Sequence, residues 1–162
     1  MWSTIIAVLG TLAGAALATL TQHAADRAPR RERHRQEVTA AVIALLEGVL
    51  RYREDYWLMI ARLRDGGRDT LEQAAVRYRL RTEITVARDR LALTARGSHL
   101  VELGEKAAWA AIELSDIPLG PASDGGFSPA TETALAAARE RSRDAHTALR
   151  QAGSTYLMSR QY

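Results

Sequence analysis

The sequence predicts an all-α protein, with an N-terminal single transmembrane helix followed by a cytoplasmic antiparallel bundle of three to four long helices. Three observations lead to this prediction. The first 20 residues contain no charged side chain, and at a rise of about 1.5 Å per residue such a helix spans a hydrocarbon core of about 30 Å. From residue 38 onward, apolar side chains recur at helical spacing. Residues 117–129, rich in Pro and Gly, interrupt this pattern late in the chain.

Residues 1–21 form the predicted transmembrane helix, and its side chains divide into a bulky face and a small face. The bulky face includes Trp2, Leu9 and Leu12. The small face consists of Ser3, Ala7, Gly10, Gly14 and Ala18. Because small residues let helix backbones approach closely inside lipid, we predict that the small face is a helix–helix assembly contact.

Two other interpretations of this segment are weaker. A secretory signal peptide has a similar apolar stretch, and Ala16 to Ala18 could serve as a cleavage site, but the positively charged region that normally precedes it is missing. A buried helix of a soluble protein is also apolar all round, but the rest of this chain supplies little large apolar surface to cover it. A membrane anchor therefore remains the preferred interpretation.

Residues 22–36 form a basic juxtamembrane segment. Its arginines are Arg27, Arg30, Arg31, Arg33 and Arg35. The positive-inside rule places the flank of the span that carries these arginines in the cytoplasm. The N-terminus is therefore expected outside. The arginines act either as a topology signal alone or also as ligands of anionic lipid head groups.

Residues 37–162 are predicted to form the helical bundle, and the first helix has the clearest pattern. Its heptad seam comprises Val38, Val42, Leu45, Val49, Tyr52, Tyr56, Met59 and Leu63. Five side chains widen the seam into a core-facing stripe: Ile43, Leu46, Leu50, Trp57 and Ile60. A stripe of this width predicts contact with two neighbouring helices. Pro29 is expected to begin this helix or to kink it away from the anchor, and Asp65-Gly66-Gly67 to end it.

Capping residues delimit the next two helices. Thr70 and Gln73 form a predicted capping box, and Gly97 is the expected end of that second helix. Its apolar line is Val76, Leu80, Ile84, Ala87 and Leu91. Ser98 is expected to cap a shorter third helix. The inward positions of the third helix are Leu100, Leu103, Ala107, Ala111 and Leu114.

The last helix follows the loop at residues 117–128. Ser128 is its predicted N-cap, Pro129 occupies the first helical position, and the helix is expected to continue to about Arg160. Its heptad line is Leu135, Ala138, Ser142, Ala145, Leu149, Ala152 and Tyr156. These small side chains allow close helix approach but bury little apolar area.

Charge is distributed unevenly over the bundle. Residues 98–138 carry one lysine against six acids, whereas the helices before and after them are basic. This pattern favours an acidic third helix packed between the basic second and fourth helices, although surface pairs of this kind contribute only tenths of a kcal/mol each. On the second helix, Arg77, Arg81 and Arg88 form a stripe that is a weak candidate for nucleic-acid contact. A solvated helix face explains the same arginines.

The composition limits the possible chemistry. The chain has no cysteine, so disulfides, thiolate metal sites and cysteine nucleophiles are excluded. The four histidines are far apart in the sequence, and no phosphate-binding, dinucleotide-binding or nucleophile-elbow motif is present. We therefore expect no enzyme activity, no catalytic residue, no metal site and no cofactor.

Three successive stretches of the sequence resemble a known family. The opening MWSTIIAVLGTLAGAALATLTQHAADRA, the Arg-rich stretch after it and the segment VTAAVIALLEGVLRYREDYWLM are similar to the small KilB-type proteins of actinobacterial conjugative plasmids and integrated elements. The likeness is strongest from Met1 to about Arg35 and around Arg51 to Trp57, while the C-terminal half is similar in being Ala-rich and helical. The resemblance implies a membrane-associated accessory protein of DNA transfer that harms its host when unrestrained.

These observations lead to one main functional hypothesis and two alternatives. The main hypothesis is a non-enzymatic, membrane-anchored, oligomerising structural or accessory protein of a plasmid DNA-transfer system. Its expected partners are the lipid bilayer, further copies of itself and other transfer proteins. The first alternative is a membrane-perturbing toxin or defence effector. The second is a membrane-tethered DNA-binding adaptor, which depends on the arginine stripe alone.

Overall fold

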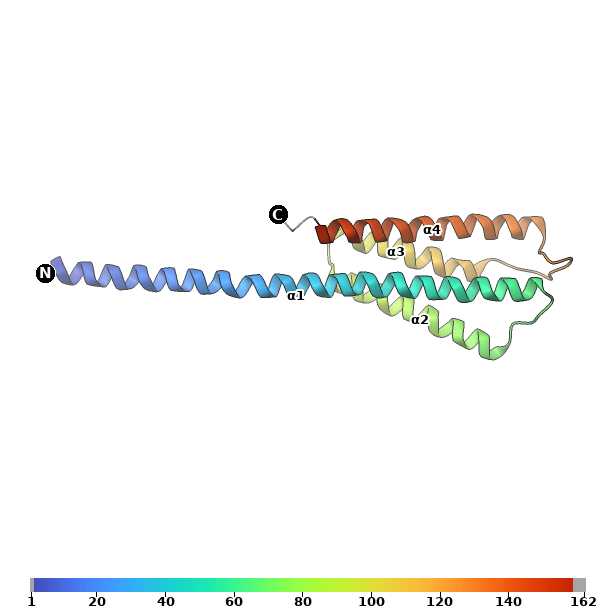
Figure 1. Cartoon of the computed structure of the whole chain (residues 1–162), viewed down its shortest axis with the longest axis horizontal. Coiled ribbons are helices and arrows are strands. Elements are labelled where there is room, and N and C mark those ends of the chain that lie inside the picture. The colour runs from blue at the N-terminus through green and yellow to red at the C-terminus, as the bar shows by residue number, and fades with distance from the viewer. Residues whose placement is uncertain (1, 159–162) are drawn as a thin grey trace. The chain divides into compact units, whose positions relative to one another are not determined.

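The computed structural model describes the backbone from Trp2 to Met158 and the side chains of residues 29–158. It contains α1 (Trp2–Arg64), α2 (Leu71–Thr94), α3 (His99–Ile112), the short 3-10 helix η1 (Glu113–Asp116) and α4 (Pro129–Met158). Over these described residues there is no strand, only an isolated bridge between Ser123 and Gly126. The predicted all-α class is confirmed (Figure 1).

The chain divides into two compact units, Met1–Glu37 and Val38–Tyr162. The predicted transmembrane side chains, including the small face Ser3, Ala7, Gly10, Gly14 and Ala18, lie outside the residues whose side chains are described. Among the described residues, no helix has an apolar stretch long enough to cross a bilayer. The transmembrane helix therefore stays a prediction.

In the second unit, successive helices run in opposite directions (Figure 1). α3 packs against both α2 and α4, so the predicted position of the acidic helix between two basic helices is confirmed. The charges do not act as we expected, however. Among the described side chains, the ion pairs recorded between helices or across their flanking turns all involve α1 or α2, as in Arg51 with Glu83 and Arg64 with Glu132. Apolar packing, together with the contact of Arg88 with the Trp109 ring, therefore holds α3 in place.

The heptad seam of α1 forms the centre of this unit. Seven of its eight side chains are buried, from Val38 to Met59, and Leu63 is partly buried. One cluster surrounds Leu45 and Tyr52 and includes Ile84 and Leu91 of α2. A second cluster surrounds Tyr56 and Ile60 at the other end of the unit. The seam prediction is confirmed apart from its last position.

The predicted widening of the seam is wrong at two positions. Ile60 is buried, and Leu46 and Trp57 are partly buried, but Ile43 and Leu50 each keep 49% of their surface exposed. The reason is geometric. α2 and α4 cover two sides of α1, and Ile43 and Leu50 point further round the helix than the side that α4 covers. No described helix covers them.

Pro29 was predicted either to begin this helix or to kink it. It does not begin the helix, because α1 continues through Pro29. A proline inside a helix removes one backbone donor and strains the preceding turn, but it does not force termination when the flanking residues favour helix. The surrounding stretch is rich in Ala and Arg, both strong helix formers. These residues explain the continuity.

The predicted caps are confirmed. The Thr70 hydroxyl accepts a hydrogen bond from the Gln73 backbone at 3.3 Å, and the Gln73 side chain accepts one from the Thr70 backbone at 3.1 Å. Ser98 accepts from the Leu100 backbone at 3.2 Å, and Ser128 from the Thr131 backbone at 3.2 Å. α1 ends at the predicted Asp65-Gly66-Gly67 turn, where Gly66 has φ 76°.

Candidate functional site

The stripe that the sequence predicted on α2 does not form one surface for phosphate contact. The Arg77 guanidinium donates to Asp55 of α1 at 3.1 Å and to Asp69 in the turn before α2. Only 11% of its side chain is exposed. Two carboxylates therefore neutralise Arg77 and tie α2 to α1, and a phosphate would have to displace them.

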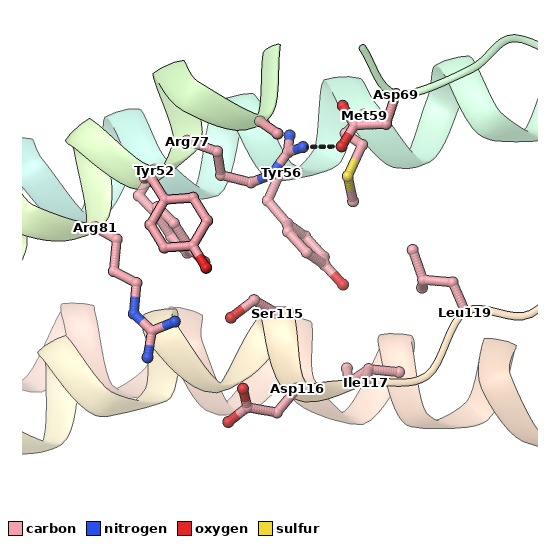
Figure 2. A pocket seen from close by; sticks show the side chains of 12 residues that line it. Tyr52, Tyr56, Met59, Asp69, Arg77, Arg81, Ser115, Asp116, Ile117 and Leu119 are labelled. Carbon is pink, nitrogen blue, oxygen red and sulfur yellow. Dashed lines mark hydrogen bonds and ion pairs between the residues drawn. The ribbon is translucent and has the colours of Figure 1, made fainter. Parts of the chain in front are cut away.

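Arg81 and Arg88 have different surroundings. Arg88 bonds the neighbouring Asp89 at 2.8 Å, and its guanidinium carbon lies 5.6 Å from the centre of the Trp109 ring of α3. Arg81 is partly buried and extends across a cleft toward the side formed by η1 (Figure 2). Nucleic-acid contact by the stripe stays a prediction, carried mainly by Arg81 and Arg88.

A cleft lies beside Arg77. It lies between the first half of α2, the second half of α1, and the segment from η1 into the following loop, with a volume of about 380 Å³ (Figure 2). Its lining combines Tyr52, Tyr56, Met59 and Leu119 with Arg81. This volume is in the range of small-molecule sites. The lining can bind a guest with an apolar body and an acceptor group.

Tyr56 contributes a polar group to this cleft. Its ring is 2% exposed, and its hydroxyl is buried without a hydrogen-bond partner among the described residues. Burial, together with the neighbouring Tyr52, raises the pKa of Tyr56 to about 12. The hydroxyl therefore stays protonated and can donate a hydrogen bond. This role was not predictable from the sequence, because Tyr52 and Tyr56 occupy seam positions that are typical of core residues.

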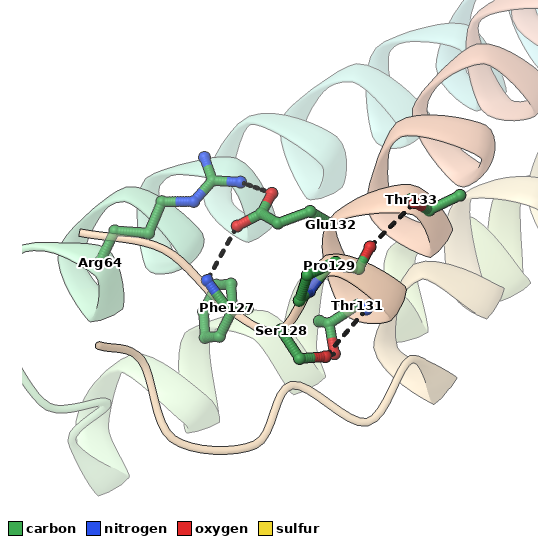
Figure 3. A network of polar contacts seen from close by, with 7 residues as sticks. All are labelled: Arg64, Phe127, Ser128, Pro129, Thr131, Glu132 and Thr133. Carbon is green, nitrogen blue, oxygen red and sulfur yellow. Dashed lines mark hydrogen bonds and ion pairs between the residues drawn. The ribbon is translucent and has the colours of Figure 1, made fainter. Parts of the chain in front are cut away.

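The loop that borders the cleft is fixed at its far end by Glu132 of α4 (Figure 3). One carboxylate oxygen accepts from the Phe127 backbone at 3.0 Å, and the other accepts from Arg64 of α1 at 2.5 Å. These two hydrogen bonds lower the pKa of Glu132. The Phe127 ring is buried beneath Arg64, whose guanidinium carbon lies 5.8 Å from the ring centre. The predicted loop at 117–128 thus exists, with an ordered end.

A second polar cluster lies where α1 meets α4. Arg53 and Trp57 of α1 and His146 of α4 each have a buried nitrogen with no hydrogen-bond partner among the described residues. The Arg139 guanidinium lies 5.3 Å from the centre of the Trp57 ring. Burial lowers the pKa of Arg53, and the neighbouring Arg139 and Arg143 lower it further. Several cations therefore share this interface, which our sequence analysis missed.

His146 makes the stability of the unit sensitive to acid. Burial lowers its pKa from 6.5, the nearby Arg53 and Arg150 add to this effect, and a hydrogen bond to the Leu46 backbone opposes it. The folded state therefore binds this proton more weakly than the unfolded chain. The contribution of neutral His146 to stability is fully present above the unfolded pKa of 6.5 and is lost progressively as the pH falls below it.

We expect His146→Gln to remove part of this pH dependence in urea unfolding followed by circular dichroism. His99→Gln is the matched control, because His99 lies on the surface with 69% of its side chain exposed. The control should unfold with the same pH profile as the parent. An unchanged profile in His146→Gln would refute the assignment of the acid sensitivity to this histidine.

The remaining predicted site residues are the juxtamembrane arginines. Arg30, Arg31 and Arg33 are exposed and Arg35 is partly buried, whereas the side chain of Arg27 lies outside the described residues. Exposure suits a contact with lipid head groups but does not test it. Among the described residues, no three His, Asp or Glu side chains are grouped to hold a metal ion.

The described part of the chain is thus an antiparallel helical domain with a small-molecule-sized cleft beside Arg77 and a basic interface between α1 and α4. The family model described as KilB plasmid transfer protein matches residues 39–157. This match covers well over half of the chain, and the chain belongs to the KilB plasmid transfer protein family. No curated protein and no solved structure matches it.

The position of the match corrects one part of the sequence analysis. The resemblance is strongest from Met1 to about Arg35 and around Arg51 to Trp57, and the family model matches the second of these stretches but does not extend to the first. An apolar start followed by arginines is common to many anchored proteins. The match extends into the Ala-rich C-terminal half.

Proposed function

We propose that this chain is a non-enzymatic, membrane-anchored accessory component of an actinobacterial plasmid DNA-transfer system, and that it oligomerises in the cytoplasmic membrane. The observation that supports a role in plasmid transfer is the family match over residues 39–157. The uncharged segment at residues 1–21 and the arginines that follow it support the anchor and the N-outside orientation. The exposed apolar and charged surfaces of the helical domain support action through assembly.

Transfer itself is the direct test. A plasmid that lacks this gene is expected to transfer poorly, and the full chain supplied in trans should restore transfer. A chain without residues 2–21, made to the same level, should restore at least about tenfold less, because the membrane then no longer concentrates it near its partners. Full restoration by the shortened chain would contradict the anchored role. Loss of host viability without any effect on transfer would favour the toxin hypothesis.

The orientation has its own test. A reporter fused after Tyr162 is expected to be active only if it is a cytoplasmic reporter, because the arginines at 27–35 lie on the side of the span that stays inside. The matched control carries an export-dependent reporter at the same position. Activity of the export-dependent fusion would reverse the topology, even if the transfer test succeeded.

A further inference from the structure

One face of α1 is apolar and has no covering helix among the described residues. It consists of Ile43, Leu46, Leu50 and Trp57, called here the α1 strip. Ile43 and Leu50 are half exposed, and Leu46 and Trp57 are partly buried against α4. Their spacing of three, four and seven residues is that of a coiled-coil contact line. Beside α4, Ile43 and Leu46 also line a groove of about 190 Å³.

The edge of the strip next to α4 is basic. Arg139, Arg143, His146 and Arg150 follow one another on α4 at heptad spacing. Arg139 lies against Trp57, His146 lies near the Leu46 backbone, and Arg150 lines the groove with Ile43. Burial and the charges of Arg139 and Arg143 lower the pKa of Arg53, which shows that these guanidinium groups repel one another, although Arg143 also pairs with Glu140 of its own helix at 2.8 Å. A carboxylate placed against this edge would relieve that repulsion.

The opposite edge of the strip is acidic. Leu46 and Arg53 face α4. Glu47 and Glu54 come directly after them in the sequence and therefore point about 100° further round the helix. Both glutamates are exposed, and neither has an ion pair with a described residue. Glu47 is level with the part of α4 around His146 and Arg150, and Glu54 with the part around Arg139 and Arg143.

From this arrangement we infer that the α1 strip binds the α1 strip of a second copy of this chain, in a parallel dimer with twofold symmetry. A twofold axis parallel to α1 places the acidic edge of each copy against the basic edge of the other at the same level. Glu54 then faces Arg143 of the second copy, and Glu47 faces its Arg150. An antiparallel twofold pairing instead brings like edges together, which repels.

The parallel arrangement gives the oligomerisation in the proposed function a specific surface. A strip that extends from Ile43 to Trp57, about 21 Å of helix and one helix wide, buries roughly 400 Å² per copy, about half of a standard interface. The dimer is therefore expected to be weak in solution and to form mainly where the chains are concentrated. It can fail while plasmid transfer and topology hold, so the two proposals are tested separately.

Cysteine crosslinking of the full chain tests the dimer, because the chain has no cysteine of its own. Ile43→Cys should form a disulfide-linked dimer on mild oxidation, since the twofold axis brings residue 43 of each copy within the roughly 7 Å that a disulfide needs between Cα atoms. Leu58→Cys is the matched control. It lies on the same helix, is 55% exposed, and lies off the strip beyond the acidic edge. Equal crosslinking of both variants overturns the proposal.

Charge reversal then tests the pairing. In the Ile43→Cys background, Glu54→Arg should lower the dimer yield by about tenfold, because two contacts per dimer become repulsive. Adding Arg143→Glu should restore it, since the two reversed charges face each other across the axis. If Arg143→Glu lowers the yield and the double variant does not recover, the basic edge binds another anionic partner, such as nucleic acid, and the proposal is overturned.

Discussion

Leu45→Asp is expected to unfold the helical domain. Leu45 has no exposed surface and lies in the larger buried cluster with Val49, Ile84 and Leu91. An aspartate there removes a large apolar side chain and buries a carboxylate without a partner, at a cost of about 4 kcal/mol or more. A domain of this size has a total stability of only about 5–15 kcal/mol.

The measurement is urea unfolding of residues 37–162, followed by circular dichroism, with the same substitution at Leu58 as control. Leu58 lies on the same helix but is 55% exposed, so Leu58→Asp should change the free energy of unfolding by no more than about 1 kcal/mol. The parent fragment should be largely helical. Equal losses in the two variants would mean that the seam does not face the core.

The elements of the fold were predictable because each rests on local signals. The capping box at Thr70 and Gln73, the cap at Ser98 and the Ser128-Pro129 start all lie where the structure has helix ends. The heptad seam from Val38 to Met59 identified the buried face of α1. Side chains three and four residues apart share a helix face in any tertiary context, so this pattern does not depend on the neighbouring helices.

The side contacts of α1 were not predictable in the same way. Periodicity shows that Ile43 and Leu50 share an apolar stripe, but it does not show how much of that stripe α4 buries. The same limit applies to Arg77. Its pairing with Asp55 and Asp69 depends on the angle at which α2 crosses α1, and the sequence contains no direct signal for that angle. The stripe was thus a reasonable surface prediction whose first member has another role.

The basic interface between α1 and α4 had a signal that was not used. Arg139, Arg143 and Arg150 recur at heptad spacing beside the small heptad line of α4, so they had to flank its contact with a neighbour. Which neighbour is a question of tertiary packing, and the structure identifies it as α1 through the contact between Arg139 and Trp57. The same packing of α4 on α1 buries Arg53 and brings Arg139 and Arg143 close to it.

The close approach of α3 to α1 and α2 gives the second large expected effect, at Gly104. A Cβ added there would lie 2.6 Å from a methyl carbon of Leu91 and 3.1 Å from one of Leu45. Leu91 and Leu45 are themselves buried. Gly104→Leu is therefore expected to destabilise the domain by about 3 kcal/mol, because the extra carbons must force α3 away from its neighbours. Glu105→Leu, at the exposed next position, should stay within about 0.5 kcal/mol of the parent.

Gly104→Ala separates the steric effect from helix propensity. Alanine favours the helix by about 1 kcal/mol over glycine, but its methyl group overlaps Leu91, so the single variant should gain no stability. In a Leu91→Ala background the overlapping methyl is gone, and the same Gly104→Ala change should then stabilise the domain by about 1 kcal/mol. Urea unfolding of the four proteins in this cycle gives the coupling between the two positions directly. If the two single effects simply add, Leu91 does not limit the approach at Gly104, and the tight contact between α2 and α3 is not what holds α3 in place.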